Sequence, residues 1–205
     1  MSKVPTLEPR RRPTAGPARK TFERILASTA ELLDEVGFDD LNTNLIAEHA
    51  NVNVASVYKY FPNKYAVLTA LADSMRDEQL ELLSERLQPQ GDWRGELGSL
   101  LDAYVDLFVS RPGFAALAAV LPSSPLLREI DQASLAAEAR VIAERLVDYG
   151  IKEKRADREA MARVILEAAR GVLPLVRLAG PTGRKRLTRE LRRMLEAYVS
   201  SYIEN

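Results

Sequence analysis

The stretch NTNLIAEHANVNVASVYKYFPNK, residues 42–64, is the most informative part of the sequence about the fold. Ile46 and Ala50 recur at helical spacing and give a first short helix an apolar face. The residues that follow, Asn-Val-Asn at 51–53, interrupt that helix. Asparagine tolerates the left-handed conformation of a tight turn, and Asn53 is placed to cap the next helix. The stretch therefore predicts two short helices joined by a three-residue turn.

The second short helix, residues 54–60, is predicted to bury Val57 and to place Phe61 in the core just beyond its end. Its other side chains are small or polar and stay available to a partner: Val54, Ala55, Ser56, Tyr58 and Lys59. A short helix that a tight turn holds across another, with such an outer face, fits the major groove of DNA. The pattern indicates a helix-turn-helix that reads a duplex.

From Ile46 to Lys64 the sequence resembles the DNA-binding signature of TetR-family repressors, and the spacing Tyr-x-Tyr-Phe-x-x-Lys is its most specific part. It differs at Asn51, Asn53 and Ala55, where the family has glycine, serine and glycine. The direct resemblance covers about residues 20–70. It implies an all-α fold, with an amino-terminal three-helix DNA-binding domain and a larger helical domain that binds an effector and dimerises.

Helical periodicity and proline or glycine breaks divide the chain into about nine helices, and no alternating run indicates a strand. The predicted domains are a flexible basic arm (1–17), a helix-turn-helix domain (18–64) and a helical effector-binding and dimerisation domain (65–205). The first helix is expected to end at Gly37, a break is expected at residues 89–91, and Pro174 is expected to interrupt the eighth helix. The later helices are predicted at about 92–110, 112–121, 124–149, 156–178 and 184–203.

The resemblance also implies roles for single residues. Lys64, at the start of the long helix, would face a phosphate together with helix amides, and Tyr58 and Tyr60 would donate hydroxyls to phosphates. An alternative role for the two tyrosines is packing of the domain. Thr43 would begin the preceding helix at the DNA backbone. Base reading would fall to side chains whose methyl, amide or ammonium groups suit base edges: Asn44, Val54, Ala55, Ser56 and Lys59.

Charge is unevenly distributed although the formal net charge is zero. Residues 10–20 carry five bases and no acid, residues 65–149 carry seven bases and fourteen acids, and the chain from 150 onward carries thirteen bases and seven acids. This charge distribution excludes a protein that coats nucleic acid with a uniformly basic surface, and it allows a local basic arm on a near-neutral protein. Arg10, Arg11 and Arg12 would either enter the minor groove beside the reading helix or form a solvated tail.

A single helix-turn-helix domain of this size contacts few base pairs, so selective binding requires a homodimer on palindromic double-stranded DNA. The last two helices carry wide apolar stripes. In a chain that resembles this family the stripes favour a dimer interface, and the alternative is that they close the chain's own core. The stripes comprise Val164, Ile165, Ala168, Val172 and Leu175, and then Leu187, Leu191, Met194, Leu195, Tyr198 and Tyr202.

Bulky apolar residues gather in the middle of the chain. In the family this region encloses a small-molecule pocket, and a ligand bound there moves the two helix-turn-helix domains of the dimer apart. The alternative role of these residues is ordinary core. A pocket with this lining favours a hydrophobic or amphipathic effector. The candidate lining is Tyr104, Phe108, Phe114, Leu117 and Leu121, with Arg140 and Arg170 as partners for a carboxylate.

Composition narrows the alternatives. The chain has no cysteine and only His49 as histidine, which excludes disulfides, thiolate metal sites and multi-histidine metal sites. No apolar run reaches the ~18 residues of a membrane span, so the cytoplasm is the expected location. No phosphate-cradling glycine loop or metal-ligand cluster indicates an enzyme, and no cofactor is expected. The remaining alternatives are an effector-independent activator or architectural DNA-binding protein, and a helical lipid-binding protein or enzyme.

Overall fold

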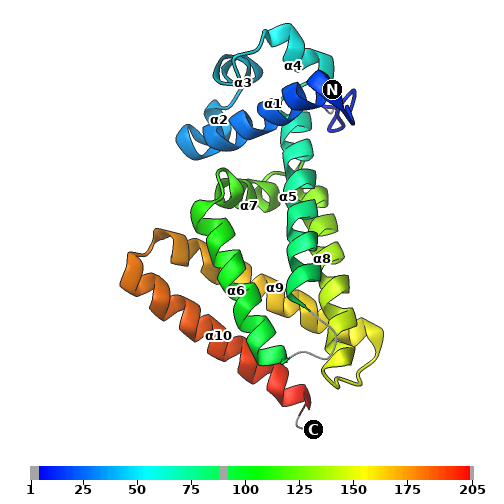
Figure 1. Ribbon diagram of the computed structural model, residues 1–205, viewed down its shortest axis with the longest axis vertical. Coiled ribbons are helices and arrows are strands. Elements are labelled where there is room, and N and C mark those ends of the chain that lie inside the picture. The colour runs from blue at the N-terminus through cyan, green and yellow to red at the C-terminus, as the bar shows by residue number, and fades with distance from the viewer. Residues whose placement is uncertain (1–4, 88–91, 204–205) are drawn as a thin grey trace. The chain divides into compact units, whose positions relative to one another are not determined.

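The computed structural model describes residues 5–87 and 92–203, and within them the chain forms ten helices and no strand. This confirms the all-α prediction, with helix ends shifted by a few residues. The predicted break at residues 89–91 lies outside the described residues. The helices (Figure 1) are α1 (Gly16–Glu35), α2 (Gly37–Asp40), α3 (Thr43–His49), α4 (Val54–Tyr60), α5 (Lys64–Arg86), α6 (Trp93–Ser110), α7 (Phe114–Ser123), α8 (Arg128–Asp148), α9 (Arg155–Leu178) and α10 (Pro181–Ile203).

The helices belong to two compact units. The first comprises the chain through Arg76 together with Pro112–Asp131, and the second comprises Asp77–Arg111 together with the chain from Gln132 onward. The chain therefore passes between the units within α5, between α6 and α7, and within α8. The predicted boundary after residue 64 differs from this division, because the start of α5 and all of α7 pack with the first unit.

In the first unit, α1 packs against α3 and α7. Its inward side chains, including Ile25 and Leu32, are buried. The position of α7 depends on Gly113, whose amide donates to the Asp34 carboxylate at 2.7 Å. Gly113 has φ +71° and lies directly against the backbone of Ala30. A side chain does not fit there, so glycine allows α7 to begin in contact with α1.

In the second unit, α6, α9 and α10 pack against one another around an apolar core. Two polar links join these helices to their neighbours, one inside the core and one at the surface. The Tyr104 hydroxyl donates to the Glu138 carboxylate at 2.8 Å, and both side chains are buried. The Arg192 guanidinium donates to the Arg94 carbonyl at 3.2 Å and lies against Gly98 of α6. A Cβ at position 98 would be 2.5 Å from the guanidinium carbon, so glycine at this position lets the guanidinium lie where it does.

One short helix was not predicted, and a proline lies inside one long helix. The four-residue helix α2 was not predicted, since so short an element has no measurable periodicity. The helix α9 spans Arg155–Leu178, close to the predicted 156–178, and Pro174 lies inside it without ending it. Proline removes one backbone hydrogen bond from a helix interior. The neighbouring side chains Leu173 and Val176 are buried and hold this last turn in helical conformation.

Replacing Gly113 by alanine should lower the free energy of unfolding by about 2–4 kcal/mol. The added methyl would lie 2.6 Å from the Ala30 backbone, at a positive φ that strains any side chain. Gly150→Ala is the matched control, because Gly150 has φ +87° and no atom lies within 4 Å of an added Cβ. It should cost only about 1 kcal/mol of backbone strain. Urea denaturation measures both, and equal losses would contradict a role for the close approach to α1.

Candidate nucleic-acid interface

Backbone and side-chain hydrogen bonds close the turn between α3 and α4. Asn51 has φ +48°, in the left-handed region, and the Val52 amide donates to the Ala47 carbonyl at 2.9 Å. The Asn53 side-chain oxygen then accepts from the Ala55 amide at 2.8 Å and caps α4. Both roles predicted for the asparagines are confirmed. The turn thus fixes the direction in which α4 leaves α3.

Aromatic contacts fix the inward side of α4 to α1. The Phe22 ring centre lies 4.8 Å from that of Phe61 and 5.8 Å from that of Tyr60. Val57 and Phe61 are fully buried, as predicted. Tyr60 is only 4% exposed. Its burial supports the packing role rather than the phosphate contact expected for it.

The outward side of α4 carries most of the predicted base-reading residues. Val54, Ala55, Tyr58 and Lys59 are exposed, and Ser56 is half-buried. The Tyr58 hydroxyl lies 2.9 Å from Thr43 Oγ1 at the start of α3, so these two side chains form one surface. Asn44, next to Thr43, is exposed as well. We call this surface the reading face; it consists of Thr43, Asn44, Val54, Ala55, Ser56, Tyr58 and Lys59.

Lys64 does not extend its ammonium into solvent. Its Nζ donates to the Phe38 carbonyl at 2.9 Å and lies 4.4 Å from the centre of the Phe38 ring. This cation–π contact and hydrogen bond tie the first turn of α5 to α2. Phosphate binding was the role expected for Lys64, whereas the structure gives its charge a partner inside the protein. Sequence reasoning missed this partner because α2 was not predicted.

The basic arm also differs from expectation. Its first four residues lie outside the described residues, and we call residues 5–13 the strap. The strap was predicted to be mobile, but it is hydrogen-bonded to the first unit. The Arg10 amide donates to the Tyr60 carbonyl at 2.7 Å, and its guanidinium donates to the Tyr58 carbonyl at 3.1 Å. Arg12 pairs with Asp73 at 2.5 Å.

The predicted effector lining does not appear as one site within either unit. Tyr104 and Phe108 belong to the second unit, whereas Phe114, Leu117 and Leu121 belong to the first, and all five are buried. Arg140 is exposed and Arg170 is half-buried. Burial, followed by the charge and hydrogen bond of Glu138, raises the pKa of Tyr104 well above its usual value. A neutral Tyr104 hydroxyl thus serves Glu138 as a permanent donor.

Hollow spaces inside the second unit are of two kinds. Two apolar cavities of about 40 Å³ each lie in its core, one of them beside Tyr104. Each has room for little more than one water molecule, so neither holds an effector as it stands. A groove of about 590 Å³ between α5 and α6 is open to solvent, and its lining includes Glu81, Asp106 and the ion pair of Arg111 with Glu78 at 3.1 Å.

The predicted dimer residues divide into two groups. Leu191 and Leu195 are 3% exposed and pack inside a single chain, so their assignment to the interface is corrected. Tyr198 and Tyr202 are half-buried with ring centres 5.5 Å apart, and desolvation, followed by the hydrogen bond and charge of Tyr202, raises the pKa of Tyr198 to about 12. Val164 is exposed, and Ala168 and Val172 are half-buried.

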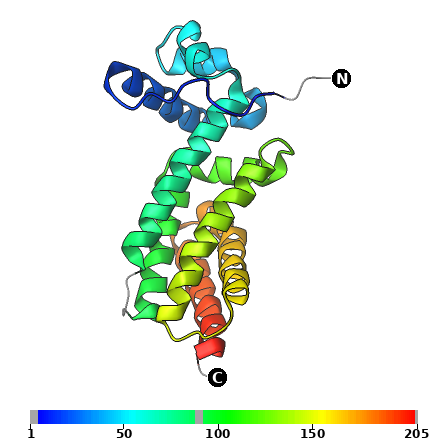
Figure 2. The same cartoon turned by 90° about the vertical axis from the view of Figure 1, so that its right-hand side faces the viewer.

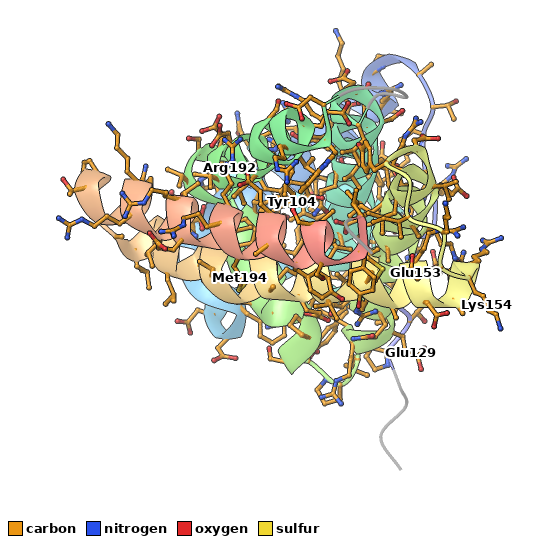
Figure 3. The ribbon with its side chains drawn as sticks, turned by 90° about the horizontal axis from the view of Figure 1, so that it is seen from below. Tyr104, Glu129, Glu153, Lys154, Arg192 and Met194 are labelled. Atoms are coloured by element: carbon orange, nitrogen blue, oxygen red, sulfur yellow. The ribbon has the colours of Figure 1, made fainter. Side chains whose placement is uncertain are left out.

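Large apolar side chains extend the exposed group. Leu175, Leu178 and Met194 are 53%, 83% and 48% exposed. Leu178 was missed, although its spacing of three from Leu175 continues the stripe. Figure 3 shows α9 and α10 side by side, with Met194 labelled. We call this surface the outer stripe; it consists of Val164, Ala168, Val172, Leu175 and Leu178 of α9 with Met194, Tyr198 and Tyr202 of α10.

The acidic side chains and the apolar helices bear on two other kinds of site. Over residues 5–87 and 92–203, no group of three or more histidine or acidic side chains is placed to hold a metal ion. In the same residues no single helix is both long and apolar enough to cross a membrane, whereas α6 and α7 taken together meet the criteria of length and composition.

Comparison with known proteins agrees with this geometry. The family described as "Bacterial regulatory proteins, tetR family" matches residues 25–71, and "Tetracyclin repressor-like, C-terminal domain" matches residues 92–198. Tetracycline repressor protein class C of Escherichia coli is 31% identical over 112 residues, 53% of this chain and 49% of that protein. HTH-type transcriptional regulator EthR of Mycobacterium tuberculosis is 32% identical over 142 residues, 65% of this chain and 66% of that protein.

A solved structure of a TetR-family transcriptional regulator from Streptomyces coelicolor is 31% identical, with a TM-score of 0.68 over 89% of this chain and 99% of that one. The chain spans only about half the length of the tetracycline repressor that it matches. The matched proteins are regulators, which confirms the prediction that this chain is not an enzyme. The carboxy-terminal match alone covers more than half of the sequence. The chain therefore belongs to the TetR family of bacterial regulatory proteins.

Proposed function

We propose that the protein is a homodimeric repressor that binds a palindromic operator through its reading face and leaves it when a small hydrophobic or amphipathic effector binds. The observation that carries this proposal is the outer face of α4, which is exposed and held at both ends while its inner face is buried. The names of the matched repressors support the sign of regulation. A protein that acts on the bacterial chromosome works in the cytoplasm.

Each residue of the reading face has a role in this proposal. Val54 and Ala55 offer methyl groups to thymine, Asn44 pairs with adenine and Lys59 reaches guanine. Ser56 adds a hydroxyl for either a base or a phosphate. The Thr43–Tyr58 hydroxyl pair, 2.9 Å apart, presents two polar oxygens at the edge of this surface and contacts the DNA backbone.

The outer stripe is the proposed dimer interface. Exposed Leu175, Leu178 and Met194 lie on helices that pack together, and large exposed apolar side chains on adjacent helices are typical of an interface between subunits. Small side chains such as Ala168, together with Gly171, allow a partner helix to approach closely. The effector would enter the apolar interior of the protein, where cavities of about 40 Å³ would have to enlarge on binding.

Selection from a random duplex pool should enrich a palindrome. Lys59→Ala should weaken binding by about 1–3 kcal/mol and relax the preference at the base that Lys59 reads. The melting temperature of Lys59→Ala should stay unchanged, because the Lys59 side chain is exposed and its Nζ lies 5.8 Å from the centre of the Tyr60 ring. Lys152→Ala, which removes an exposed lysine from the second unit, is the control and should bind like the wild type. No enrichment by the wild-type protein at low salt would contradict the proposed function.

Met194→Glu should convert the dimer to monomers and abolish tight operator binding, because it would bury a carboxylate at the interface. Val147→Glu is a matched control, since Val147 is also 48% exposed but lies on α8, away from the outer stripe. That variant should remain dimeric. Sedimentation velocity of both proteins measures the change. Persistence of the dimer in Met194→Glu would place the interface elsewhere.

A further inference from the structure

The strap runs along the first unit as an extended segment (Figure 2). Its side chains alternate, with Pro5, Leu7 and Pro9 half-buried and the intervening residues exposed. Alternation of this kind is expected when one side of an extended segment packs against a surface. Prolines at positions 5, 9 and 13 fix φ and reduce the conformational entropy that docking costs. The composition of the strap thus favours a bound, extended conformation.

The strap supplies hydrogen-bond donors to the carboxyl end of α4. The last carbonyls of an α-helix have no partner within the helix. In α4, the Tyr58 carbonyl accepts from the Arg10 guanidinium at 3.1 Å, and the Tyr60 carbonyl accepts from the Arg10 amide at 2.7 Å. A cation at a helix carboxyl terminus also interacts favourably with the helix dipole. Arg10 therefore caps the carboxyl end of the helix whose amino end Asn53 caps.

Contacts on α5 hold the strap on either side of Arg10. The Asn63 side-chain amide donates to the Thr6 carbonyl at 2.9 Å, while its oxygen accepts from the Ala66 amide at 3.0 Å. Farther along, Arg12 pairs with Asp73, which also pairs with Arg76 at 2.9 Å. The strap consequently links α4 to the first three turns of α5.

These contacts divide the three arginines. The charges of Arg10 and Arg12 have partners inside the first unit, whereas Arg11 is exposed and, within the described residues, makes no ion pair or hydrogen bond. We propose that Arg10 and Arg12 are positioning residues, which hold α4 in the orientation that reads DNA, and that Arg11 alone of the three contacts the duplex. The inference rests on the proposed DNA-binding function, but its first test does not need DNA.

That first test is hydrogen exchange of the DNA-free protein. Arg10→Ala should speed exchange about five- to tenfold in peptides that cover α4, the factor expected when a helix end loses a capping contact. Arg11→Ala, the matched control one residue away, should leave exchange in α4 unchanged. Unchanged exchange in Arg10→Ala would overturn the positioning role, whether or not the protein binds DNA.

The second test is operator affinity as a function of salt concentration. Loss of a phosphate contact lowers the slope of log K against log salt by about 0.9 per protomer. Arg11→Ala should show this decrease. Arg10→Ala should bind about three- to tenfold more weakly at every salt concentration with an unchanged slope. An equal loss of slope in both variants would make Arg10 a DNA contact and refute the proposal.

The Asp73→Asn variant distinguishes two roles of Asp73, because they predict opposite changes in DNA affinity. Removal of a negative charge should tighten binding to DNA if Asp73 acts only through the electrostatic field. If Asp73 holds the strap through Arg12, binding should instead weaken, about two- to fivefold. Glu23→Gln, which removes the partner of Arg19 on α1, is the control and should not weaken binding. Tighter binding by Asp73→Asn would contradict the proposed positioning role of the strap. A wild-type protein that binds no duplex would refute the proposed function, while the exchange experiment would still decide the role of Arg10.

Discussion

A helix of seven residues is too short to be stable by itself, so the position of α4 depends on what its buried side contacts. The decisive contact is that of Phe22 with Tyr60 and Phe61. It joins α4 to α1, a helix of 20 residues whose inward side is buried along its length. Aromatic rings bury a large apolar area and lose few rotamers on ordering. This contact places the exposed residues of α4 in space together with the turn from α3 and the strap.

The features that could be predicted from the sequence are those whose partners are close in the chain. Asn51 and Asn53 act on amides and carbonyls a few residues away, and the burial of Val57 follows from helical spacing. The partners of Lys64 and Arg10 lie 26 and 48 residues away. A basic residue at a sequence position that suits phosphate looks the same whether its charge meets DNA or a carbonyl of the protein. Long-range hydrogen bonds of this kind have no periodicity that a sequence could show.

The apolar stripes show a related limit. Met194 and Leu195 are neighbours in the sequence, yet Met194 is exposed and Leu195 is buried, because successive residues of a helix point about 100° apart. A wide stripe on α10 therefore contains both a side that faces α6 and α9 and a side that faces outward. The sequence indicated the width of the stripe. It could not assign the two sides, because the assignment depends on which neighbouring helices cover α10.

The approach of Arg192 to Gly98 has a consequence for how this sequence can diverge. A methyl group on position 98 and a guanidinium at position 192 would occupy the same space. Arg192 also binds Glu196 at 2.8 Å and the Arg94 carbonyl, so a displaced guanidinium would lose partners that it has here. A larger residue at position 98 therefore displaces the Arg192 guanidinium, whereas a shorter residue at position 192 leaves room for it. Among homologues that keep the α6–α10 contact, the size of residue 98 and the length of residue 192, 94 positions apart, should therefore be correlated.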